Sequence, residues 1–106
     1  MPAFSTVRLN QAALIWADRP LGGPIGAQLH VMLQSLLDEG AIPVVIDLVR
    51  VPAVDDGIVA VLAAAASQAG FLGRALELRL AGGRRYSVRD AVQLRLALAQ
   101  AYPTAA

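Results

Sequence analysis

Cysteine and lysine are both absent from this chain of 106 residues. Without cysteine there is no disulfide framework, no thiolate metal site and no thiol nucleophile. Nine arginines carry all of the basic charge against eight acids, and their largest cluster is the pair Arg84 and Arg85. A nucleic-acid-binding domain normally shows a dense basic patch. The composition therefore predicts no nucleic-acid partner.

Long apolar runs are also missing. The longest candidate, residues 57–73, contains Ser67 and Gln68 and falls short of the roughly 20 apolar residues that a membrane span needs. The N-terminus lacks a basic segment followed by an apolar run, so we expect no signal peptide and a cytoplasmic location. A hydrophobic content of 57% is enough to fill one core, and we expect a single domain over residues 1–106.

The N-terminal half predicts two strands followed by an amphipathic helix. Short β-favouring runs at residues 6–9 and 12–17 indicate a hairpin or two adjacent strands, with Trp16 in or near the core. Pro24 suits the first turn of a helix because its missing N–H is not needed there. Apolar residues then recur at helical spacing until Gly40, a natural C-terminal stop.

The remaining elements alternate between strands and helices. Val44, Val45 and Ile46, followed by Leu48, form a β-branched and apolar run without alternation, which is typical of a central strand covered on both faces. A helix is predicted over residues 56–68, an alternating strand over 76–80, and a last helix that begins at a capping box between Ser87 and Asp90. The expected fold class is α/β, a mixed β-sheet with helices in the order β-β-α-β-α-β-α.

This order of elements, together with the segments VVIDLVRVPAVDDGIVAVL and GRALELRLAG, resembles the STAS family of sulfate-transporter and anti-sigma-factor-antagonist domains. The resemblance covers nearly the whole chain. It implies a STAS-like fold and a protein-binding module without catalytic activity. In antagonists of this family a partner kinase phosphorylates a hydroxyl residue at the start of a helix, which weakens binding to that kinase.

The resemblance places that regulated position in this chain, where the hydroxyl residues are replaced. Residues 47–48 match the acidic strand end of the family, and Asp55 matches the acid that opens its motif. Without gaps, Asp56 and Gly57 then occupy the two hydroxyl positions of the motif, and Ile58 occupies its glycine position. A one-residue gap would instead align Gly57 with the glycine of the motif and delete one hydroxyl position. Neither alignment supplies a serine or threonine. The resemblance therefore implies a degenerate phosphorylation position at Asp56 and Gly57.

Two interpretations of the acidic pair are open. Asp56 could imitate a phosphorylated residue, although one charge is less than the charge of about minus two on a phosphoserine. Alternatively, Asp55 and Asp56 cap the helix and complement the positive end of its dipole. Arg50 is close enough in sequence to pair with one of them.

The helix that follows the acids carries no charge between Gly57 and Gly73. Part of its surface must be buried, left as a smooth patch or used to dock a partner. The STAS resemblance favours docking, because antagonists of the family present this helix to their partners. The predicted partner-binding residues are Asp55, Asp56, Gly57, Val59, Ala60 and Ala63.

The sequence gives weaker signals for a metal site, a catalytic histidine or an anion site. Asp47, Asp55 and Asp56 could supply oxygen ligands, but a receiver-like metal site would also use a lysine, and we expect no metal and no cofactor. His30 lacks a nucleophile beside it, so it is predicted to be a surface or partly packed histidine. The glycine-rich segments 22–26 and 82–85 are predicted turns, with an anion site at Arg84 and Arg85 as the alternative for the second.

The sequence thus predicts a regulatory module that is not an enzyme. The preferred partner is a kinase-like anti-sigma factor or another signalling regulator, bound through the start of the uncharged helix. The alternative is an accessory subunit of a membrane transport complex, in which the same helix docks onto a permease or ATPase. A homodimer is possible in either case.

Overall fold

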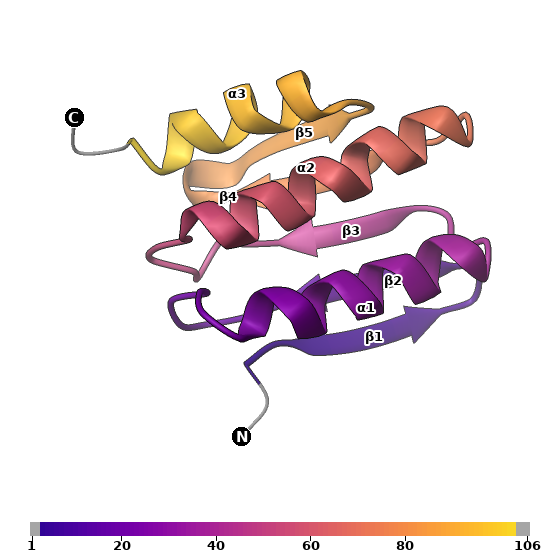
Figure 1. Ribbon diagram of the computed structural model, residues 1–106, viewed down its shortest axis with the longest axis horizontal. Coiled ribbons are helices and arrows are strands. Elements are labelled where there is room, and N and C mark those ends of the chain that lie inside the picture. The colour runs from indigo at the N-terminus through magenta and orange to yellow at the C-terminus, as the bar shows by residue number, and fades with distance from the viewer. Residues whose placement is uncertain (1–2, 104–106) are drawn as a thin grey trace.

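The computed structural model describes residues 3–103, which form a five-stranded sheet and three α-helices (Figure 1). The strands lie in the order of the chain, with β1 and β5 at the edges. The outer pairs β1–β2 and β4–β5 are antiparallel, whereas β2, β3 and β4 run parallel. The elements are β1 (Ser5–Leu9), β2 (Ala12–Trp16), α1 (Ile25–Asp38), β3 (Val44–Asp47), α2 (Asp56–Phe71), β4 (Leu76–Leu80), a 3-10 turn (Ala81–Gly83), β5 (Arg84–Val88) and α3 (Ala91–Ala101).

All three helices cover one face of the sheet, with α2 between α1 and α3 (Figure 1). The strand register explains the core beneath them, because side chains directly opposite one another in neighbouring strands share a face. One such row consists of Ala13, Val44, Leu76 and Val88, all of which are buried. Leucines of α1 and α2 close the core from above, including Leu29, Leu33 and Leu62.

Within residues 3–103, no helix covers the other face of the sheet (Figure 1). The expectation that the third strand is covered on both faces is therefore wrong, although β3 is the central strand and Val45 is buried on the open side. Trp16 lies on this open face with 37% of its surface exposed, so it is not a core residue. We attribute the β-branched run of β3 to its central position, where the neighbouring strands shield a short side chain such as Val45 on the open face.

The C-terminal third contains a strand that the sequence interpretation lacked. Residues 84–88 form the edge strand β5, so the observed order is β-β-α-β-α-β-β-α. Ser87 lies within this strand and does not begin the helix. The N-cap of α3 is Asp90, whose Oδ1 accepts a hydrogen bond from the Gln93 backbone N–H at 2.8 Å.

The α/β class and the mixed sheet with helices are confirmed, as are the positions of α1 and β4 and the start of α2. Helix α2 continues to Phe71, beyond its predicted end at residue 68. Gly40 ends α1 with a φ of +82°, a left-handed conformation that glycine adopts without strain. None of the helices within residues 3–103 combines the length and apolar character that a membrane crossing requires.

Candidate functional site

The loops that lead into α1 and α2 meet at the carboxyl ends of the parallel strands. Leu21 and Val54 form an isolated parallel bridge. The Leu21 N–H donates to the Ala53 carbonyl at 3.0 Å, and the Asp55 N–H donates to the Leu21 carbonyl at 3.1 Å. These bonds fix the start of α2 relative to the start of α1.

Asp55 joins the two helix starts through its side chain. Its Oδ1 accepts from the Ile58 N–H at 2.8 Å as the N-cap of α2, and its Oδ2 accepts from the Gly23 N–H at 2.8 Å. The hydrogen bonds from Gly23 and then from Ile58 lower the pKa of the Asp55 carboxyl below its ordinary value, because they favour the charged form. Glycine is needed at Gly22, where a Cβ would lie 2.8 Å from Oδ2. Asp55 therefore has a structural role at the centre of the candidate site.

Asp56 and Gly57 are exposed at the first turn of α2, next to this cap. The Asp56 charge lies at the helix N-terminus, where the helix dipole favours it. Arg50 forms no ion pair with Asp55 or Asp56. Within the part of the chain that the structure describes, Asp47, Asp55 and Asp56 do not gather into a cluster that could hold a metal ion.

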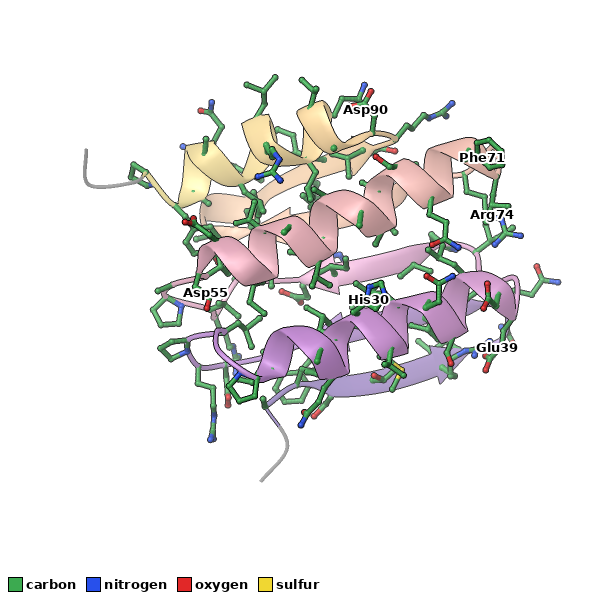
Figure 2. The ribbon with its side chains drawn as sticks, viewed as in Figure 1. His30, Glu39, Asp55, Phe71, Arg74 and Asp90 are labelled. Atoms are coloured by element: carbon green, nitrogen blue, oxygen red, sulfur yellow. The ribbon has the colours of Figure 1, made fainter. Side chains whose placement is uncertain are left out.

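The solvent-facing side of α2 is a stripe without charge. Its exposed residues recur at spacings of three and four, which places them on one side of the helix. The stripe ends at Phe71, which is 92% exposed and lies at the opposite end of α2 from Asp55 (Figure 2). We call this surface the α2 stripe, and it consists of Gly57, Ala60, Ala64, Ser67 and Phe71.

The structure corrects one predicted binding residue. Ala63 is only 3% exposed, so it belongs to the core and cannot contact a partner. Because α2 packs against the sheet and between α1 and α3, a wide arc of the helix is buried, and this arc includes Ala63 and Ala66. Ala60 is exposed as expected, Val59 is half-buried, and the next exposed alanine is Ala64.

The remaining sequence candidates lie outside the α2 stripe, although His30 on α1 and Ala64 of the stripe line the same small hollow. His30 is exposed on α1 (Figure 2). Within the glycine-rich segment 22–26, the Gly23 N–H is already bonded to Asp55. Arg84 and Arg85 belong to β5, and the Arg84 Nη1 donates to the Gln100 carbonyl at 3.1 Å. The second glycine-rich segment is therefore a 3-10 turn into a strand.

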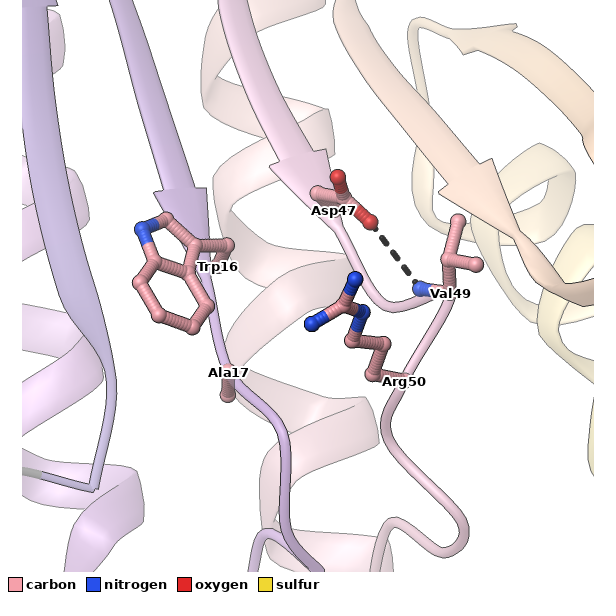
Figure 3. A pocket seen from close by; sticks show the side chains of 5 residues that line it. All are labelled: Trp16, Ala17, Asp47, Val49 and Arg50. Carbon is pink, nitrogen blue, oxygen red and sulfur yellow. Dashed lines mark hydrogen bonds between the residues drawn. The ribbon is translucent and has the colours of Figure 1, made fainter.

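Two features of the molecule were missed from the sequence. Phe71 lies beyond the predicted end of the helix, and its signal was the absence of charge up to Gly73. The second feature is a hollow of about 460 Å³ on the other side of the strand ends, lined by Trp16, Ala17, Asp47, Val49 and Arg50 (Figure 3).

No protein-family model matches the chain, and no curated protein matches its sequence.

Proposed function

We propose that this chain is a protein-binding regulatory module without catalytic activity, which docks a partner through the start of α2 and the α2 stripe. The preferred partner is a kinase-like anti-sigma factor or another signalling regulator, as the STAS resemblance implies. The fold class is compatible with this assignment. The proposal puts the contact surface on Asp56, Gly57 and the exposed residues that follow them.

The observation that carries the proposal is the composition of the α2 stripe. Its small side chains permit close approach of another backbone or helix, and no charge would have to be desolvated between Gly57 and Gly73. At the far end the stripe presents Phe71, which is 92% exposed. Aromatic side chains are enriched at interfaces between proteins.

The proposed binding has no serine or threonine switch. Asp56 and Gly57 stand at the positions that the resemblance assigns to the phosphorylated residue, and both are exposed. The nearest downstream hydroxyl, Ser67, lies about three turns further along α2 at the ordinary helical rise. In this proposal the affinity for the partner is constant, and the bound fraction depends only on the partner concentration.

The missing hydroxyl favours a second candidate, an accessory subunit of a transport complex. In that case the α2 stripe docks onto a permease or an ATPase, and no phosphorylation is needed. The two candidates predict different partners on the same surface.

The test is a quantitative pull-down from the source cell with Ala64→Arg as the interface variant. Ala64 is exposed at the middle of the α2 stripe, so arginine should add a charge and bulk to the surface without entering the core. Ser35→Arg is the control, because Ser35 is exposed on α1 and does not line the hollows beside Ala64 and Asp56. Circular dichroism should show both variants folded.

The proposal predicts that a partner recovered with the wild-type chain and with Ser35→Arg is lost with Ala64→Arg. The identity of the recovered partner decides between the two candidate functions. An anti-sigma factor or another regulator supports the first, and a permease or ATPase subunit supports the second. Equal recovery of the same partners with both variants would show that α2 is not the docking surface.

A further inference from the structure

The hollow at the ends of β2 and β3 brings three chemically different side chains together. Trp16 and Asp47 are the last residues of their strands and lie directly opposite one another in the parallel register. Arg50 follows three residues after Asp47, and Figure 3 shows its guanidinium directed back toward the strand ends. An indole, a carboxylate and a guanidinium therefore line one hollow of about 460 Å³.

The location and size of the hollow suit a small ligand. Ligand sites in proteins commonly measure about 300–1,000 Å³ and combine apolar walls with a few convergent polar groups. In open α/β sheets they favour the carboxyl ends of parallel strands. Ala17 and Val49 also line the hollow.

The two charged side chains that line the hollow do not pair with each other. Asp47 and Arg50 form no ion pair, although both line the hollow. Asp47 is held in place because its Oδ1 accepts a hydrogen bond from the Val49 N–H at 3.0 Å (Figure 3). The Arg50 side chain is exposed and presents a donor fork suited to a carboxylate.

The pair of opposite charges selects the class of ligand. A ligand with only a negative charge would be attracted by Arg50 and repelled by Asp47. A ligand with only a positive charge would be attracted by Asp47 and repelled by Arg50. A molecule with a carboxylate and an ammonium group on neighbouring atoms satisfies both, and an apolar substituent on it would lie against the indole of Trp16. We propose that this hollow binds a free α-amino acid with an apolar side chain, with its carboxylate on Arg50 and its ammonium on Asp47.

This site is independent of the α2 stripe. Trp16 and Asp47 lie on the open face of the sheet, whereas α2 covers the other face. Failure of either proposal therefore leaves the other standing.

Trp16 supplies the measurement, because it is the only tryptophan in the chain. L-Leucine is the probe, since its aliphatic side chain does not absorb at the excitation wavelength of tryptophan. The titration runs to about 10 mM, which would nearly saturate a site with a dissociation constant of about 1 mM. N-acetyl-leucine, which lacks the ammonium charge, and leucinamide, which lacks the carboxylate, are titrated in parallel.

Three variants connect the signal to the residues. Arg50→Gln removes the positive charge of the guanidinium. Asp47→Asn removes the negative charge and keeps an oxygen that can accept the hydrogen bond from the Val49 N–H. Charge-assisted hydrogen bonds predict that each variant weakens leucine binding about tenfold or more. Arg95→Gln is the matched control, because Arg95 is an exposed arginine on α3 and does not line the hollow.

The proposal predicts a saturable change in Trp16 fluorescence with leucine, weaker binding of both derivatives, loss of affinity in Arg50→Gln and Asp47→Asn, and wild-type affinity in Arg95→Gln. It is overturned if leucine causes no change, if either derivative binds as tightly as leucine, or if the two hollow variants retain wild-type affinity while folded.

Discussion

Gly70 offers the sharpest test of how α2 and the segment before α3 pack. A Cβ added at this position would lie 1.9 Å from the Arg89 carbonyl oxygen and 3.0 Å from its carbonyl carbon, whereas real Cβ contacts are essentially never shorter than 3.0 Å. The substitution Gly70→Ala therefore requires the two backbones to separate by about 1.1 Å, the difference between 3.0 and 1.9 Å. Neither atom at Arg89 can rotate away, because both belong to the main chain.

Two opposing effects set the magnitude. Alanine stabilises a helix interior relative to glycine by about 0.5–1 kcal/mol. Forcing extra volume into a packed contact costs about 1–3 kcal/mol, and a clash between main chains should lie at the upper end of this range. The net expectation is a loss of about 2 kcal/mol in the free energy of unfolding, and since 1 kcal/mol corresponds to about 4–8 °C in a domain of this size, a fall in Tm of about 10 °C.

Gly26→Ala is the matched control within a second helix. A Cβ at Gly26 would lie 3.9 Å from Val61 Cγ2, an ordinary contact, so the helix-propensity gain should remain. Urea unfolding followed by circular dichroism should place Gly26→Ala at or above the wild-type stability and Gly70→Ala well below it. If Gly70→Ala is as stable as the wild type, the close approach between α2 and the Arg89 carbonyl is wrong.

Three further perturbations test other parts of the structure. Folding lowers the pKa of the Asp55 carboxyl, so the ionised carboxylate stabilises the folded state. This stabilisation is complete at pH values above the ordinary pKa of 3.8, and it is lost as the pH falls through the lower pKa of the folded state. Between about pH 6 and pH 3 the wild type should lose more of its free energy of unfolding than Asp55→Asn, and parallel losses in urea titrations would contradict the cap. Tyr102→Phe should lower the free energy of unfolding by about 1 kcal/mol, because the hydroxyl donates to the Val51 carbonyl at 2.8 Å; an unchanged urea midpoint would refute that bond. After incubation with candidate anti-sigma kinases, intact-mass and peptide analysis should find no phosphate on the segment containing Asp56 and Gly57, and a phosphate mapped there would overturn the proposed loss of the switch.

The sequence carries clear signals where one face of an element is strongly apolar. The stripe of large residues in α1 and the alternation in β4 each match the buried side that the structure shows. Asp55 was also identified correctly as a helix cap, although its second bond, to the Gly23 N–H, joins residues 32 positions apart and leaves no local pattern.

Alanine explains the error at Ala63. A run of alanines has almost no contrast between faces, so its periodicity cannot reveal that α2 lies between two other helices. The large residues Ile58 and Leu62 indicated one core direction, and the breadth of the buried arc followed only from the packing.

Strand β5 was missed for a related reason. It is an edge strand in which only Val88 is fully buried, and Arg84 and Arg85 face solvent. Charged residues are common on edge strands because they discourage pairing with other chains, and they also remove the alternation by which a strand is recognised. The preceding glycines and the spacing from Ser87 to Asp90 favoured a turn and a helix start instead.

The central claim is that a partner contacts the exposed side of α2. The most direct measurement places a photo-crosslinking benzoylphenylalanine at position 64 or, as the control, at position 35, which is exposed on α1, and maps adducts formed in the source cell by mass spectrometry. We predict a discrete adduct with a regulatory protein or a transport subunit from position 64 and none with that protein from position 35. An adduct with the same partner from position 35 alone would contradict the account.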